Sequence, residues 1–353
     1  KKTELQARVA EAVKRGAIAA LAGEALEAAI DALRTAAARE ALTTGETDTP
    51  TPLGVVLGSA IPTAETREAF VRLWFEHRAD VATFWDEAAN LDPFEQDPSL
   101  LEATREALRF GVFAEYRMPV YEKLRTWSGV TSFRDLAKLS TNGWSSLVDN
   151  VEGPPATWLP EDLPGSDLSE RKLSYAKRLK ATIEAAFPTV AVASELGRTI
   201  PVTGGQIAYQ HAKTFLDRSE NGSFDLVQTR IDAYIAATPT AFAEEATTAE
   251  REGAVRALRR MQRLYRVAPK AEAMFKLLEA GIESAADICE MGEEGYKTAM
   301  FAVVSEEEAE MNYKRAEEAH MATQAIVAAL GGSGATTNAV TPPSAAEIPR
   351  ADL

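Results

Sequence analysis

Apolar residues recur at steps of three to five along most of this chain, in a background rich in alanine. That spacing places them on one face of an α-helix, and alanine has the lowest free-energy cost of any residue in a helix. Clear examples are 64–77, 170–186 and 246–266, with about four more helices in 271–330. Residues 4–42 show the same pattern, as one helix or as two divided near Gly16 and Gly23. Strands need apolar and polar residues in alternation, which is almost absent. The sequence therefore predicts an all-α fold, an irregular repeat of solenoid-like helix pairs with little or no strand.

Four further segments have expectations of their own. Residues 54–58 (GVVLG) are apolar and β-branched, so we expect either a short strand or a buried loop there. Residues 98–126 predict two helices, broken near Gly111 or Pro119, whereas the proline-rich segment 157–167 predicts a loop. A further helix is expected over 225–236.

Composition divides the chain into four parts. They are an N-terminal helical segment (1–42), a first helical repeat lobe (43–200), a second helical repeat lobe (201–330) and a linker or disordered tail (331–353). The chain starts at Lys1 without a signal-peptide pattern, and we expect it to be a piece of a longer polypeptide.

An internal repeat is the strongest signal in the sequence. Residues 129–139 (GVTSFRDLAKL) align with residues 281–291 (GIESAADICEM). The glycine of each copy is expected to end a helix with positive φ, and the serine and aspartate to form a short capping box that starts the next helix. The predicted cap residues are Gly129, Ser132, Asp135, Gly281, Ser284 and Asp287. The repeat therefore predicts two similar helix–turn–helix units in a stacked architecture.

Charge and composition exclude several function classes. The net charge of −15 repels phosphate backbones and anionic lipid unless a local basic patch overrides it. The single cysteine, Cys289, excludes an internal disulfide and a cysteine-based zinc site, and its place in the repeat predicts core packing. The three histidines lack metal-ligand spacing, and no stretch is apolar enough to predict a membrane span. We therefore expect no metal, no cofactor and no membrane contact by this segment.

Catalytic motifs are also missing from the sequence. It has no Gly-x-Ser-x-Gly elbow, no His-Glu-x-x-His pair and no sialidase box, and its glycine pairs lack the lysine of a phosphate-binding loop. Its paired carboxylates are typical of solvated helix faces in an acidic protein. The expectation is a chain that is not an enzyme; an unrecognised site in a deep pocket stays open.

One basic stripe stands out from the acidic background. It comprises Arg256, Arg259, Arg260, Arg263 and Arg266, in the helix predicted over 246–266. Such a stripe can bind an anion or a nucleic acid, or can pair with acidic helices nearby such as 306–318. We favour the second interpretation because the whole chain is acidic.

The second copy of the repeat is also similar to the first half of the helix-hairpin-helix modules of DNA-repair proteins. Those modules hold phosphate on a glycine hairpin, whereas this chain continues as Phe301-Ala-Val-Val-Ser305-Glu-Glu-Glu308. A nucleic-acid-binding module is therefore the alternative to the main hypothesis, which follows.

A wider resemblance covers about residues 50–330. The stretches that carry it are Glu76-His77-Arg78, Glu184-Ala-Ala-Phe187-Pro188-Thr189, Phe224-Asp225-Leu226 and Val255-x-x-Leu258-Arg-Arg-Met261-Gln-Arg-Leu264-Tyr265 with its continuation to Ala285. In these apolar, glycine and cap positions the chain resembles the large A component of bacterial tripartite toxin complexes (Tc toxins).

The resemblance implies a region of the α-helical shell of that toxin component. In the family this shell surrounds a translocation channel in a pentamer, while pore helices and the cargo enzyme lie elsewhere. The implied partners are other copies of the same chain and other toxin-complex subunits, with no nucleic acid. The implied location is secreted or at the cell surface, as part of a larger bacterial toxin, and the implied role is a non-catalytic scaffold.

Overall fold

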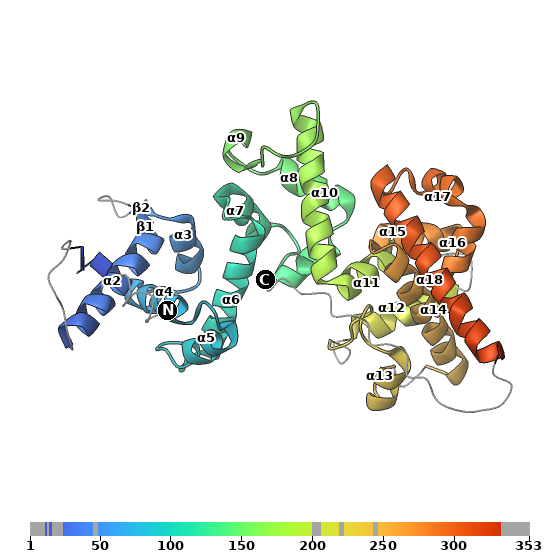
Figure 1. Ribbon diagram of the computed structural model, residues 1–353, viewed down its shortest axis with the longest axis horizontal. Coiled ribbons are helices and arrows are strands. Elements are labelled where there is room, and N and C mark those ends of the chain that lie inside the picture. The colour runs from blue at the N-terminus through green and yellow to red at the C-terminus, as the bar shows by residue number, and fades with distance from the viewer. Residues whose placement is uncertain are drawn as a thin grey trace. The chain divides into compact units, whose positions relative to one another are not determined.

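A computed structural model describes residues 11–12, 14–15, 24–44, 49–199, 206–218, 222–242 and 246–332, with side chains up to Ile326 (Figure 1). Within these ranges the only strands are β1 (Thr43–Thr44) and β2 (Thr49–Pro50), which pair antiparallel. The rest of the regular structure is helical, which confirms the predicted all-α fold. The predictions for 1–10 and for the tail after Gly332 lie outside the described residues.

The chain forms two compact units. The first contains the residues up to Phe133 together with Asn150–Glu161, and the second contains Arg134–Asp149 together with the residues from Asp162 onward. These units divide the chain at other points than the expected lobes 43–200 and 201–330. The reason is that helices on both sides of residue 200 contribute to one hydrophobic core in the second unit.

The first unit packs short helices around a cluster of aromatic rings. The rings of Phe70, Phe84 and Phe94 are buried, and Phe70 meets Phe84 edge-on at 5.1 Å between ring centroids. Besides the two strands, its elements are α2 (Glu24–Leu42), α3 (Pro52–Gly58), α4 (Ala64–His77), α5 (Val81–Ala88), α6 (Pro98–Phe113), α7 (Met118–Thr126) and α9 (Pro155–Trp158).

The expected strand or buried loop at 54–58 is wrong, because these residues belong to helix α3. The Thr51 hydroxyl caps this helix by accepting a hydrogen bond from the Gly54 N–H at 3.0 Å, and Pro52 occupies its first position. Gly54 also lies against α2, where a Cβ atom would come within 2.0 Å of the Leu42 carbonyl oxygen. Tertiary packing on α2 and α6 therefore overrides the β-propensity of the two valines.

Most other helix predictions are confirmed. The predicted helix over 64–77 is α4, the break in 98–126 falls between α6 and α7, and four helices occupy 271–330. The helix expected over 225–236 starts later, at Ile231, because the Asp225 carboxylate accepts hydrogen bonds from the N–H groups of Val227 and Gln228 and forms a turn. Helix α9 extends to Trp158, slightly into the expected loop.

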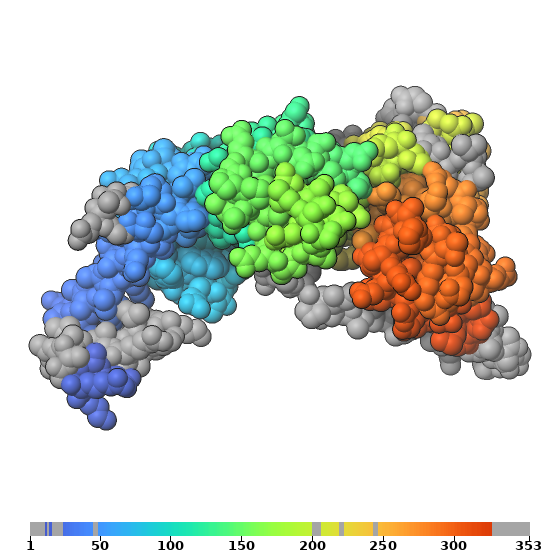
Figure 2. Space-filling model, turned by 90° about the horizontal axis from the view of Figure 1, so that it is seen from above, coloured from blue at the N-terminus to red at the C-terminus, as the bar shows by residue number. Residues whose placement is uncertain are grey.

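The second unit packs longer helices around small residues. Gly253 of α14 lies so close to α12 that a Cβ atom there would be 3.4 Å from the Ala208 methyl group, so these two helices approach closely. Figure 2 shows the later helices of this unit, coloured orange to red, gathered into one body. Its elements are the 3₁₀-helix η2 (Phe133–Lys138, whose first residue closes the first unit), α8 (Thr141–Asp149), α10 (Leu168–Ala186), α11 (Pro188–Arg198), α12 (Gln206–Asp217), α13 (Ile231–Ala237), α14 (Thr248–Val267), α15 (Ala271–Glu279), α16 (Ala285–Met291), α17 (Glu293–Met300) and α18 (Glu306–Gly332).

Candidate functional site

The turn before α16 has the geometry that the repeat predicts. Gly281 has a φ of 77°, and Ser284 is the N-cap of α16. The Ser284 hydroxyl accepts a hydrogen bond from the Asp287 N–H at 3.3 Å, and the Asp287 carboxylate accepts one from the Ser284 N–H at 3.0 Å. These residues form a reciprocal capping box.

The first copy of the repeat also has a positive-φ glycine, but a different type of helix follows it. Gly129 also has positive φ, at 84°, but the residues after Ser132 form the 3₁₀-helix η2 instead of an α-helix. The Asp135 carboxylate contacts the Lys138 ammonium at 2.6 Å, and the Phe133 N–H donates to Glu106. Gly129 and Gly281 therefore both form turns with positive φ, and the reciprocal capping box is that of Ser284 and Asp287 in the second copy.

Replacing Gly281 by alanine is expected to lower the free energy of unfolding by about 1 kcal/mol, because its backbone is left-handed. No atom lies within 4 Å of the new Cβ, so the cost comes from backbone conformation alone. Urea unfolding of the full chain measures it. Gly281→Asn is the matched variant and should cost less, since asparagine tolerates this conformation; equal costs would contradict the explanation.

The basic stripe lies on α14, and neighbouring acids pair with much of it. Arg259 contacts Asp232 of α13, and the Arg260 guanidinium lies 2.9 Å from the Glu283 carboxylate. Arg256 is 3.8 Å from Glu252 of its own helix. Arg266 donates weakly to the Val227 carbonyl at 3.4 Å, whereas Arg263 is exposed and has no ion pair among the described residues. The stripe therefore leaves only part of its charge available to an anion.

The stripe pairs with nearby acids as expected, but Arg256, Arg259 and Arg260 contact other carboxylates than those of the segment given as the example, 306–318. Lys270, just after α14, does contact that segment, with its ammonium 2.7 Å from Glu308. The arginines pair instead with α13 and with the turn before α16, because those elements pack beside their faces of α14.

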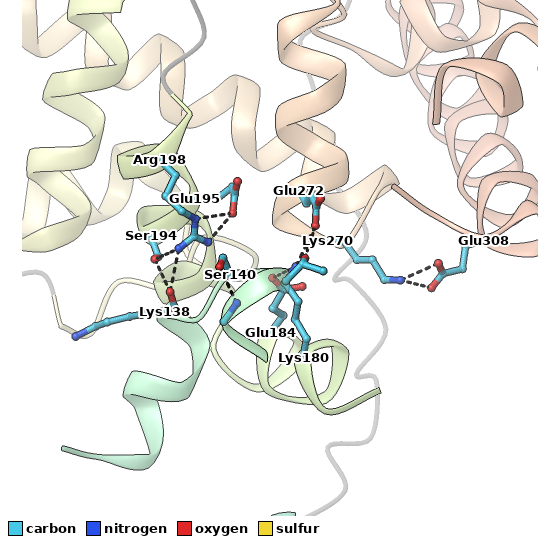
Figure 3. Close-up of polar contacts among 12 residues, drawn as sticks. Lys138, Ser140, Lys180, Glu184, Ser194, Glu195, Arg198, Lys270, Glu272 and Glu308 are labelled. Carbon is cyan, nitrogen blue, oxygen red and sulfur yellow. Dashed lines mark hydrogen bonds and ion pairs between the residues drawn. The ribbon is translucent and has the colours of Figure 1, made fainter. Parts of the chain in front are cut away.

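A partly buried polar cluster in the second unit was not predicted from the sequence. We call it the polar junction; its members are Thr141, Lys180, Glu184, Lys270, Glu272 and Glu308. Figure 3 labels the charged members. The Lys180 ammonium lies 3.1 Å from Glu184, one turn further along α10, and 3.4 Å from Glu272 of α15. The Thr141 hydroxyl of α8 donates to Glu272 at 2.8 Å. The junction therefore connects α8 and α10 with α15, and Lys270 connects α15 with α18.

Burial sets the electrostatics of the junction. Lys180 is 7% exposed and Glu184 is 5% exposed. Burial raises the pKa of the Glu184 carboxyl, and the Lys180 ammonium partly opposes that rise. Burial also raises the pKa of Tyr265, whose hydroxyl has no hydrogen-bond partner in the structure, and the charge of Glu184 adds to this effect. Lys180 and Glu184 therefore form a desolvated ion pair within α10, and each charge depends on the other.

A second polar contact in this unit joins η2 and α11. The Arg198 guanidinium, at the end of α11, donates to the Lys138 carbonyl and to the Ser194 hydroxyl, each at 2.9 Å (Figure 3). The Ser194 hydroxyl donates to the same carbonyl at 2.9 Å. These bonds fix the end of η2 against α11.

A cleft of about 720 Å³ opens over the polar junction. Side chains from α10, α15, α17 and the turn into α18 line it, and half of the lining residues are lysine or glutamate. A smaller hollow of about 340 Å³ lies between α12 and α14, lined by Ile207, Gly253 and Arg256 among others.

Neither a metal site nor a membrane span is found in the part of the chain that the structure describes. There, no three histidine, cysteine or acidic side chains lie close enough together to hold a metal ion, and no helix has the length and apolar character needed to cross a bilayer. The His77 ring contacts Glu87 at 3.0 Å. Cys289 is partly buried and packs against the core of the second unit.

Comparison of the chain with protein-family models, with curated proteins and with solved structures finds no match.

Proposed function

We propose that this chain is a non-catalytic structural scaffold, part of the α-helical shell of a secreted, oligomeric toxin component that forms a translocation channel. The observation that carries the proposal is the polar junction, which ties four helices that are distant in sequence into one layered body. Such cross-links hold helices at fixed positions, which is what a wall segment requires. The oligomeric assembly in this proposal is taken from the resemblance to tripartite toxin complexes.

The surface of the second unit fits the same role. Arg259 and Arg260 contact Asp232 and Glu283, and these ion pairs stabilise the packing of helices within the second unit. Arg256 and Arg263 stay exposed and can reach an acidic neighbour in an assembly. The partners under this proposal are further copies of the chain and other subunits of the toxin complex.

Negative-stain electron microscopy of the full-length parent chain at neutral pH tests the proposal. A large particle with fivefold symmetry and a central channel is the expected result. A compact monomeric particle would overturn it.

Charge reversal tests whether the exposed arginines contribute to assembly. The double variant Arg256→Glu with Arg263→Glu, made in the parent chain, should lower the oligomer mass in sedimentation velocity and lower it more at low salt. Lys276→Glu, an exposed change on α15, is the matched control and should leave the mass unchanged. An unchanged mass for the double variant would sink this role of the stripe.

A further inference from the structure

The turn between α17 and α18 exposes an aromatic side chain. Phe301, directly after α17, is 85% exposed and lines the cleft over the polar junction. It is the most exposed large apolar side chain among the described residues. A phenylalanine this exposed contributes little to the hydrophobic core, so core packing does not explain why position 301 is aromatic.

One face of α17 carries charged and polar side chains that line the cleft together with Phe301. Glu294, Lys297, Thr298 and Phe301 follow each other at intervals of three, one and three residues, so they share one side of the helix. All four line the cleft. The aromatic ring and the Glu294 carboxylate therefore belong to one surface.

Three of the four lysines that line the cleft are already paired. Lys180 contacts Glu184 and Glu272, Lys270 contacts Glu308, and the Lys297 ammonium lies 2.6 Å from Glu293. Lys177 of α10 has no ion pair among the described residues. These pairs neutralise most of the positive charge around the cleft.

Carboxylates outnumber cations on α17 and at the start of α18. Glu294 is 91% exposed and shares Lys297, 3.8 Å away, with Glu293, which lies closer to that ammonium at 2.6 Å. Glu306, the first residue of α18, is exposed and has no ion pair within the described ranges. One ammonium therefore faces three carboxylates, and the net charge beside Phe301 in the sequence is negative.

We propose that this cleft binds a lysine or arginine side chain presented by a polypeptide partner. The cation would lie on the Phe301 ring, where the negative face of the aromatic system attracts it, while Glu294 and Glu306 supply opposite charge. The cleft is large enough to take the side chain together with its neighbours in the partner chain. This inference concerns a docking site and is independent of the scaffold proposal.

Fluorescence anisotropy with the full chain tests the inference. The probe is a fluorescein-labelled peptide, Gly-Leu-Arg-Leu-Gly, and the matched peptide carries citrulline, a neutral isostere, in place of arginine. The arginine peptide should bind about tenfold more tightly, and added salt should reduce that difference. Free spermidine, added as a competitor, separates a site for any small cation from a site for a polypeptide.

Three variants make the test specific. Phe301→Ala should weaken binding of the arginine peptide about fivefold, and Glu294→Gln with Glu306→Gln about tenfold. Ile207→Ala, which also removes an exposed apolar side chain but beside the other hollow, should leave binding unchanged. Because all these side chains are exposed, the thermal midpoints should match that of the unaltered chain.

Three results would overturn the inference. They are equal binding of the arginine and citrulline peptides, unchanged binding after Phe301→Ala, and spermidine binding as tight as that of the peptide. None of them bears on the particle seen by electron microscopy, so the two proposals fail separately.

Discussion

Replacing Lys180 by methionine is expected to lower the free energy of unfolding by about 3 to 5 kcal/mol. The substitution keeps the apolar stem of the side chain but leaves the Glu184 carboxylate, 5% exposed, without its ammonium partner. Urea unfolding of the full chain, followed by far-ultraviolet circular dichroism, measures the loss. Lys177→Met, on the exposed face of the same helix, is the matched control and should change stability by less than about 0.5 kcal/mol.

The pH dependence of that loss identifies its cause. Burial already raises the pKa of Glu184, and removing Lys180 raises it further because the ammonium opposed the rise. The folded state of the variant then binds a proton that the unfolded state releases, so its stability falls as pH rises from the unfolded glutamate pKa of about 4.3 through the raised folded value. The deficit relative to the unaltered chain should be small below about pH 4 and fully developed at neutral pH.

A double substitution completes the test of the junction. Lys180→Met combined with Glu184→Leu removes both buried charges, and it should recover most of the stability that Lys180→Met loses. A deficit in the single variant that is independent of pH would show that an unpaired Glu184 is not its source.

Replacing Gly54 by alanine is expected to destabilise the first unit by about 3 kcal/mol. The new Cβ atom would lie 2.0 Å from the Leu42 carbonyl oxygen, which is backbone and cannot rotate away, so α2 and α3 must separate. Separation would also disturb the buried Val56 and Leu57. Thermal unfolding monitored by circular dichroism measures the effect.

Gly58→Ala, in the same helix, is the matched control for this prediction. Its Cβ atom would meet only the Arg67 guanidinium, at 3.9 Å, and Gly58 is exposed. Alanine is a better helix former than glycine, so this variant should be unchanged or more stable by up to about 1 kcal/mol. If both substitutions cost the same, close packing of α3 on α2 is not the reason for the glycine at position 54.

Local sequence patterns predict the helices well and their tertiary contacts poorly. The spacing of Phe70, Leu73 and Trp74 locates α4, because helical periodicity is encoded within the segment itself. Residues 54–58 are mispredicted because the helices that α3 packs on, α2 and α6, lie outside the segment. The turn before α16 is predictable because its pattern is also local: all members of its capping box are close in sequence.

The candidate sites show the same limit. Lys180 and Glu184 are one turn apart, but so are Lys213 and Asp217, which lie on the surface. Nothing in the sequence marks the first pair as buried, because that depends on Glu272 and on the packing of α15. Nor does a phenylalanine reveal its own exposure, so Phe301 is found only from the structure.

The route of the chain between its two units has a consequence for how the protein can be cut. The polypeptide passes from the first unit to the second after Phe133, returns after Asp149 and leaves again after Glu161. A fragment that starts at Asp162 therefore lacks α8, whose buried Trp144 packs in the second unit, and one that ends at Phe133 lacks α9, which packs on α7. During synthesis, α8 emerges before α10 can cover it. The segments of the two units are therefore synthesised in alternation. No single cleavage of the chain yields either unit whole.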